Sequence, residues 1–158
     1  MAFELVNGKN EVVAEQDIHG EVLLMTFGFT RCTGTCPVVL RRLRESLELL
    51  PEDSAAQVRV VFIGVDYRYD SPEQVAHFAE AHGPRFMGLT GSSDDLQQLY
   101  RRMGVSARHV ESSDGPVFMH HATGIYLVDA KGRPRYLVEA DASTATLANT
   151  VQRLLTGA

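Results

Sequence analysis

The chain contains little cysteine: Cys32 and Cys36 are the only two among its 158 residues. A chain of this length can bury most of its apolar surface in one core, so no disulfide is needed to hold a small fold together. The two cysteines are therefore available for chemistry. Their number suits a cytosolic enzyme as well as an exported redox or metal protein, so it does not indicate the compartment.

Two further absences exclude broad classes of function. The formal net charge is -5 at pH 7 and charges of both signs are interspersed, so no basic face is available for nucleic-acid phosphates. The longest apolar run, VLLMTFGF at residues 22–29, is far shorter than the roughly 20 residues of a membrane span. We therefore expect a soluble chain that has no nucleic-acid partner.

The arrangement of apolar residues predicts one domain over residues 1–158, because no repeat and no Pro/Gly/Ser-rich linker divides the sequence. Near-continuous apolar runs at 20–29 and 57–66 are typical of strands buried on both faces of a largely parallel sheet. The pair Asn7-Gly8, between two short strand-like runs, predicts an N-terminal hairpin.

Helical patterns follow the predicted strands. Leucines recur every three or four residues between Pro37 and Pro51, which predicts an amphipathic helix that begins at the first proline and ends at the second. The next helix has Ser71 as its N-cap, Gln74 to complete a capping box and Gly83 as its stop. The remaining expected elements are a strand at 85–91, a helix at 93–104, an antiparallel hairpin at 124–140 and a helix at 143–157.

This order of elements predicts an α/β fold of the thioredoxin-like sandwich type. Its central β-sheet is mixed, helices cover both faces, and a β-hairpin lies at the N-terminus. The two cysteines fall where a buried strand ends and a helix begins.

The junction FGFTRCTGTCPVV favours reactive cysteines. Unpaired N–H groups and the dipole at a helix N-terminus stabilise a thiolate. If both cysteines lie in or just before the first turn, their spacing puts both sulfurs on one side, close enough to form a disulfide or to bind one metal ion. Two ordinary buried thiols are the alternative, but the polar segment TGT between them favours an exposed rim.

A third metal ligand can come from the six histidines. His19 in a turn, His77 and His82 in the helix at 71–83, and His109 in the polar loop at 106–115 are most simply solvated side chains. His120 and His121 differ, because they precede a strand that would run beside the strand leading to the cysteines. A loop there can reach the cysteine helix, although two solvated imidazoles on a surface loop would fit the same pattern.

Two thiolates and one imidazole suit copper, because sulfur ligands favour Cu(I) and a nitrogen ligand lets the site also hold Cu(II). Zinc accepts the same ligands with an open fourth position. The residue types alone leave both metals open.

Four stretches together resemble the Sco (SenC/PrrC) family, the thioredoxin-fold copper chaperones of cytochrome c oxidase assembly. They are GEVLLMTFGFTRCTGTCP, GVDYRYDSPEQV, HGPRFMGLTGSSDDLQQLYRRMGV and HHATGIYLVDAKG, within a likeness that runs from about residue 3 to residue 155. In that family two cysteines and one histidine bind copper, which implies Cys32, Cys36 and His121 as copper ligands here. Thr33 replaces a usual proline, and His120 replaces a usual acidic residue and could compete for the metal or contact a ligand.

The resemblance also implies a role and a place in the cell. The chain would deliver copper to the binuclear copper site of an oxidase subunit on the periplasmic or another extracytoplasmic side of a membrane, with a second copper chaperone as donor and a membrane tether outside this chain. Tyr67, Arg68 and Tyr69 could meet the partner. A well-capped helix start, in which Asp66 and Asp70 satisfy local N–H groups, is the alternative interpretation of that segment.

A thiol–disulfide oxidoreductase is the alternative function, with Cys32 and Cys36 as a catalytic redox pair that acts on oxidase cysteines or in redox signalling. Only the metallochaperone needs His121. Thioredoxin-type reductases place a cis-proline before the strand that faces the redox pair, and HHATGIYL contains no proline, which favours metal binding. Peroxidase activity is less well supported, because FTRCTGTCP lacks the proline- and threonine-containing loop of peroxiredoxins.

Overall fold

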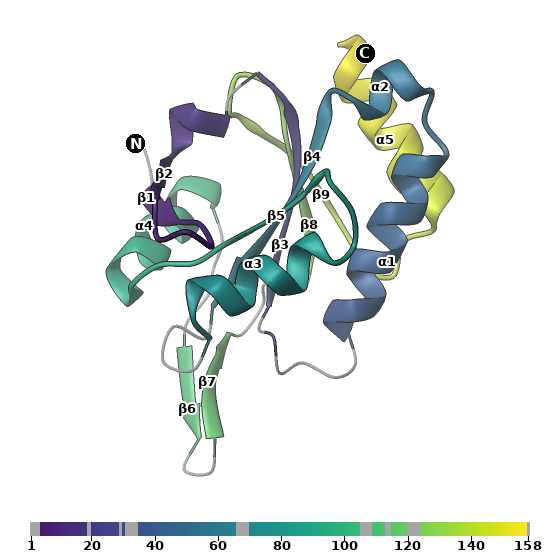
Figure 1. Ribbon diagram of the computed structural model, residues 1–158. Coiled ribbons are helices and arrows are strands. Elements are labelled where there is room, and N and C mark those ends of the chain that lie inside the picture. Colours follow the sequence, from purple (N-terminus) through teal and green to yellow (C-terminus); the bar gives the residue numbers. More distant parts are fainter. Residues whose placement is uncertain are drawn as a thin grey trace.

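The computed structural model describes residues 4–18, 20–28, 30, 35–65, 70–104, 109–112, 115–119 and 124–157; for residues 35, 36, 109–112 and 115–119 it describes the backbone alone. Its centre is a sheet with the strand order β5-β4-β3-β8-β9 (Figure 1). The strands are β3 (Val22–Gly28), β4 (Val58–Gly64), β5 (Phe86–Leu89), β8 (Ile125–Val128) and β9 (Pro134–Val138). β3, β4 and β5 are parallel, whereas β8 is antiparallel to both β3 and β9, so the predicted mixed sheet is confirmed.

The central strand β3 is buried on both faces, which explains its continuous apolar sequence. All seven of its residues are buried. Val22 and Leu24 belong to one apolar cluster, while Leu23, Met25 and Phe27 belong to the other. Because successive side chains of a strand point to opposite faces, this single strand contributes to both halves of the core.

Helices cover both faces of the sheet, as predicted. α1 (Thr35–Glu48), α3 (Pro72–Glu80) and α5 (Thr144–Thr156) bury apolar side chains in the cluster on one face, and α1 lies beside α5 (Figure 1). α4 (Ser93–Met103) and the N-terminal strands β1 (Glu4–Val6) and β2 (Val12–Ala14) cover the other face, together with the short 3-10 helix η1 (Glu15–Ile18). A one-turn helix, α2 (Glu52–Ala55), separates α1 from β4. None of the helices in the described ranges is long and apolar enough to cross a membrane.

Most helix boundaries agree with their sequence signals. Ser71 caps α3 and forms the predicted capping box with Gln74, and α4 ends at Gly104 with φ of 70°. α1, however, begins at Thr35, two residues before Pro37. The N–H groups of the first helical turn have no partner within the helix, so a proline, which lacks an N–H, is tolerated anywhere in that turn. Pro37 therefore indicates the first turn of the helix but not its first residue.

The N-terminal hairpin is confirmed, but its turn is longer than Asn7-Gly8 predicts. β1 and β2 pair in antiparallel fashion around residues 7–11. The Asn7 Oδ1 atom accepts hydrogen bonds from the backbone N–H groups of Lys9, at 2.9 Å, and Glu11, at 3.0 Å, and Asn10 has the left-handed φ of 60°. Gly8 serves packing instead, since a Cβ atom there would lie 2.5 Å from the Ala76 Cβ atom of α3.

The expectation of a polar loop over 106–115 is wrong. β6 (His109–Ser112) and β7 (Gly115–Met119) form an antiparallel pair, which Figure 1 shows extending away from the main body. In the sheet topology of the described residues these two strands pair only with each other. The sequence of β6, HVES, has one apolar residue and therefore lacks the alternation that predicts a half-buried strand.

Candidate metal centre

The predicted ligands lie mainly outside the described residues. Cys36 is the second residue of α1, where its backbone is helical. Cys32, His120 and His121 are not among the described residues, and the same holds for His19, Asp66, Tyr67, Arg68 and Tyr69. The described elements that flank these residues are β3, α1 and β8.

Two of these flanking strands lie side by side. β3 leads toward Cys32, and β8 begins shortly after His121. The two strands are antiparallel, with Leu23 opposite Val128 and Met25 opposite Tyr126. The carboxyl end of β3 and the amino end of β8 consequently lie at the same edge of the sheet, which confirms the predicted pairing of these strands.

Aromatic side chains fill the core beneath this edge. The Phe27 ring meets Tyr126 edge-on with ring centroids 5.7 Å apart, and it meets Tyr100 at 5.8 Å. All three residues are buried. Burial raises the pKa of Tyr126 above its ordinary value, so its phenol is neutral at physiological pH. The edge rests on an apolar layer that contributes no charge.

The segment that follows β3 is held by hydrogen bonds to two other parts of the chain. The Gly28 carbonyl accepts a hydrogen bond from the Val65 N–H at 2.8 Å. The carboxylate of Asp70, directly before the Ser71 cap, accepts hydrogen bonds from the Thr30 N–H at 2.7 Å and from the Thr30 hydroxyl. Asp70 is only 5% exposed.

The well-capped start of α3 is confirmed. Among the described residues, the hydrogen-bond partner of the Asp70 carboxylate is Thr30, 40 residues away in the sequence, and the part of the interpretation that concerns Asp66 lies outside the described residues. Thr30 and Asp70 are the residues near the site that sequence reasoning missed. One signal could have indicated them: Ser71 and Gln74 already complete the cap of α3, which leaves the carboxylate of Asp70 available for another donor.

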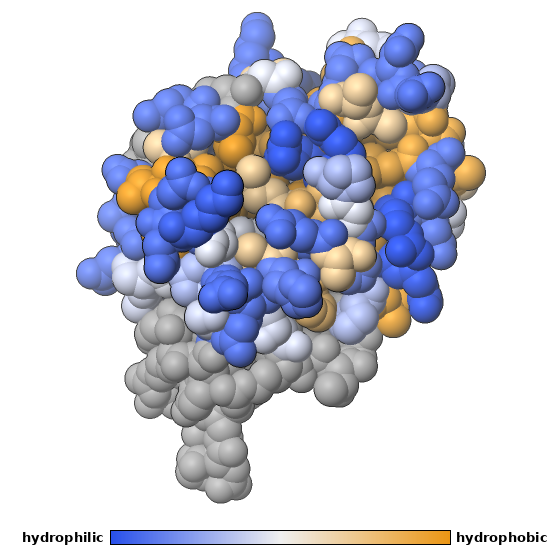
Figure 2. Space-filling model, in the orientation of Figure 1, coloured by the Kyte–Doolittle hydropathy of each residue, from blue (hydrophilic) through white to orange (hydrophobic). Residues whose placement is uncertain are grey.

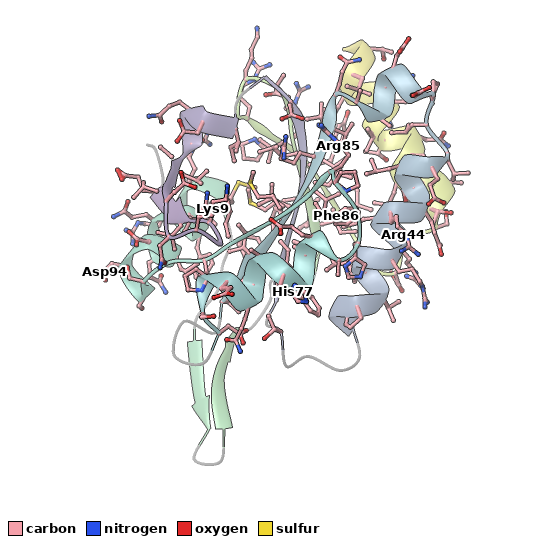
Figure 3. The ribbon with its side chains drawn as sticks, in the orientation of Figure 1. Lys9, Arg44, His77, Arg85, Phe86 and Asp94 are labelled. Carbon is pink, nitrogen blue, oxygen red and sulfur yellow. The ribbon has the colours of Figure 1, made fainter. Side chains whose placement is uncertain are left out.

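The other described histidines lie elsewhere. His77 is exposed on α3, where Figure 3 labels it. His82 follows the end of α3, and its half-buried ring packs between Phe78 and Phe86, with Nδ1 3.2 Å from the Phe78 carbonyl oxygen. The expectation that His82 is a solvated residue within the helix is therefore wrong. Among described side chains, no group of three or more His, Cys, Asp or Glu residues is placed to hold a metal ion.

A groove between the N-terminal hairpin, α3 and β5 lies beside the sheet and not at this edge. It contains charges of both signs, from Lys9 and Arg59 as well as Glu73 and Glu80. Figure 2 shows mainly hydrophilic side chains over α3 and the hairpin on this face. The groove also reaches Phe86 at the amino end of β5, so it is separate from the carboxyl end of β3.

Comparison with known proteins identifies the family. The sequence profile described as SCO1/SenC matches residues 1–156. This chain belongs to the SCO1/SenC family. Sco family members are copper-binding proteins involved in cytochrome c oxidase assembly.

Individual Sco proteins are similar to this chain in sequence and in fold. Protein SCO1 homolog 1, mitochondrial, from Arabidopsis thaliana is 30% identical over 126 residues, which cover 80% of this chain and 38% of that protein. The structure of Bradyrhizobium japonicum ScoI with copper bound has a TM-score of 0.81 and 27% identity, and the match covers 98% of each chain. The solution structure of apo Sco1 from Thermus thermophilus has a TM-score of 0.86 and 29% identity, covering 97% of this chain and 90% of that one.

These similarities confirm the thioredoxin-like Sco fold. The chain spans about two-fifths to two-thirds of the length of the curated relatives that it matches.

Proposed function

We propose that this chain is a copper metallochaperone that binds copper, as Cu(I) or Cu(II), through Cys32, Cys36 and His121 and delivers it to the binuclear copper site of cytochrome c oxidase. Membership of the Sco family supports copper as the cargo. The antiparallel pairing of β3 with β8 is the observation that carries the choice of ligands, because it brings the ends of their flanking elements to one edge of the sheet.

Chain lengths agree with this ligand set. Cys32 is four residues beyond Gly28, the last residue of β3. His121 is three residues before Gly124, which directly precedes β8. Cys36 is in the first turn of α1. Each of the three residues is thus close in sequence to an element at this end of the sheet, which supports the proposed ligand set.

The chemistry of the ligands suits transfer as well as binding. Thiolate sulfur binds Cu(I), and adding an imidazole allows the site to accept Cu(II) as well. Unpaired N–H groups in the first turn of a helix favour the thiolate that a metal requires. Cys36 is the second residue of α1, which supports its choice as a ligand. A site with three ligands from one protein leaves a position open, so a partner ligand can enter before copper leaves.

The proposed receiver is the copper-site subunit of the oxidase, and another copper chaperone supplies the ion. Involvement of the family in oxidase assembly supports this partner. We place the transfer on the extracytoplasmic side of a membrane, in keeping with a mitochondrial relative. A thiol–disulfide oxidoreductase that uses the same two cysteines is the competing function.

Copper binding by the fully reduced protein tests the proposal. The wild type is expected to bind one equivalent of Cu(II) with thiolate-to-copper charge-transfer absorption. His121→Ala should change the absorption and EPR spectra and lower the affinity by more than roughly tenfold, because it removes a direct ligand. His120→Ala is the matched control, one position away, and should retain the wild-type spectra.

The competing function predicts a different pattern. If the reduced wild type fails to retain copper while both histidine variants keep full disulfide reductase activity, the chaperone proposal is overturned and the oxidoreductase remains. If His120→Ala changes the spectra and His121→Ala does not, copper binding stands but the assigned imidazole is wrong.

A further inference from the structure

The hydrogen bonds between Asp70 and Thr30 join two parts of the chain that lie far apart in sequence. The buried Asp70 carboxylate receives both the N–H and the hydroxyl of Thr30. Hydrogen bonds to an ionised acceptor are roughly twice as strong as those between neutral groups. Thr30 precedes Cys32 by two residues, so these hydrogen bonds hold the chain directly before the first cysteine.

Asp70 is not needed to cap the helix that follows it. The Ser71 hydroxyl accepts a hydrogen bond from the Gln74 N–H at 3.1 Å, and the Gln74 side chain accepts one from the Ser71 N–H at 2.8 Å. This reciprocal pair forms the capping box of α3 without help from a neighbouring carboxylate. The carboxylate of Asp70 thus serves the Thr30 segment.

Helix α3 provides a rigid base for Asp70, because it packs unusually close to the sheet. A Cβ atom on Gly88 of β5 would lie 2.4 Å from the Val75 carbonyl oxygen, and a Cβ atom on Gly64 of β4 would lie 2.6 Å from a Val75 methyl group. Only glycine permits both approaches. The start of α3 is consequently fixed relative to the strands, and Asp70 is fixed with it.

We propose that Asp70, acting through Thr30, is a positioning residue that fixes the beginning of the cysteine segment relative to α1 and β8. The inference rests on the proposed function for its copper consequence, but its effect on the two thiols is independent of copper. Fixing Thr30 reduces the conformations open to Cys32, which raises the effective concentration of its thiol near Cys36. It also preorganises the ligands before copper arrives.

Four variants separate positioning from general stability. Thr30→Val removes the hydroxyl donor while retaining the shape of the side chain, and Thr30→Ser restores the donor. Asp70→Asn retains the shape of the acceptor but removes its charge. The matched control is Ser46→Ala, which removes a buried hydroxyl that donates to the Arg42 carbonyl at 2.8 Å, ten residues along α1 from Cys36.

The first measurement needs no metal. The apo protein is equilibrated with reduced and oxidised glutathione, so that Cys32 and Cys36 lose two electrons and two protons to form a disulfide while one glutathione disulfide is reduced to two thiols. Thr30→Val and Asp70→Asn should lower the equilibrium constant for disulfide formation by roughly tenfold, because the effective concentration of the two thiols falls. Thr30→Ser and Ser46→Ala should match the wild type.

Competition with a Cu(I) chelator supplies the second measurement. Thr30→Val and Asp70→Asn should each weaken Cu(I) binding by roughly tenfold, as expected for a group that holds a ligand in position. The double variant should lose little more than either single variant, since both break the same contact. Thr30→Ser should bind Cu(I) like the wild type.

The two measurements separate the two proposals. If neither the wild type nor any variant binds copper, but Thr30→Val and Asp70→Asn shift the disulfide equilibrium as expected, the proposed function fails and the positioning role stands. If Thr30→Val and Asp70→Asn lower the free energy of unfolding as Ser46→Ala does, yet leave the disulfide equilibrium unchanged, the positioning role is overturned.

Discussion

At the scale of single residues, Asp129 shows how a buried carboxylate is held in the turn between β8 and β9. Burial alone would raise its pKa. The hydrogen bonds that Asp129 accepts outweigh burial and hold its pKa below the ordinary value of 3.8. The donors are the backbone N–H and guanidinium of Arg133, the backbone N–H of Lys131 and the guanidinium of Arg135. Because the folded pKa is the lower one, Asp129 stabilises the fold above the unfolded value, and this stabilisation is lost as the pH falls through the folded pKa.

Asp129→Asn should therefore lower the free energy of unfolding at pH 7 by about 1–3 kcal/mol, since charge-assisted bonds in a buried turn are replaced by weaker ones. The difference from the wild type should shrink as the pH falls below about 4. Urea unfolding at pH 7 and at pH 3.5 measures both. Asp141→Asn, at an exposed position, is the control and should change little at either pH. A difference that stays constant with pH would contradict the assigned cause.

At the scale of elements, the close packing of α3 on β5 depends on Gly88. An added Cβ atom would meet the backbone of Val75 and Ala76, at 2.4 to 2.8 Å, so the helix itself would have to move. Gly88→Ala should cost about 2–4 kcal/mol in the free energy of unfolding, at the upper end of overpacking effects. Thermal and urea unfolding measure this cost.

Gly64→Ala is the matched comparison, because the atoms nearest to its added Cβ belong to the Val75 side chain and not to the helix backbone. Combining it with Val75→Ala should relieve most of its strain, whereas Val75→Ala should give no relief to Gly88→Ala. Equal relief at both positions would show that the side chain, and not the helix backbone, limits the approach of α3.

Local signals in the sequence account for many of the elements but not for all. The Ser71 capping box and the Gly104 stop are predictable, because a few adjacent residues determine each of them. The β6–β7 pair is not predictable in this way, because the sequence of β6 lacks the alternation of apolar and polar residues that indicates a half-buried strand. The turn after β1 also escapes prediction, because Gly8 is required by its contact with α3 and not by the hairpin.

At the scale of the whole molecule, some features around the candidate site can be predicted from the sequence and others cannot. The pairing of β3 with β8 follows from the order of buried strands and helices, so it is predictable that the carboxyl end of β3 and the amino end of β8 lie together. The contact between Asp70 and Thr30 crosses 40 residues and depends on where α3 lies on the sheet. No periodicity or cap encodes that distance, which is why only the structure reveals it.

The shared central strand also bears on the prediction of one domain. Leu24 belongs to the apolar cluster beneath α1, α3 and α5, whereas Met25 belongs to the cluster beneath α4, and both are almost completely buried. If β3 left the sheet, apolar side chains of both clusters would be exposed to solvent. We therefore expect both halves of the core to unfold in one transition.

Leu24→Ala and Met25→Ala test this from opposite faces of β3. Each should lower the free energy of unfolding by about 2–5 kcal/mol, because each leaves a cavity in a close-packed core. Far-UV circular dichroism reports the helices, and near-UV circular dichroism reports the tyrosines, of which Tyr100 and Tyr126 lie in the cluster beneath α4. In both variants the two signals should share one urea midpoint. If Leu24→Ala shifts the helical signal and leaves the tyrosine signal at its wild-type midpoint, the two faces are separate folding units and the chain is not one cooperative domain.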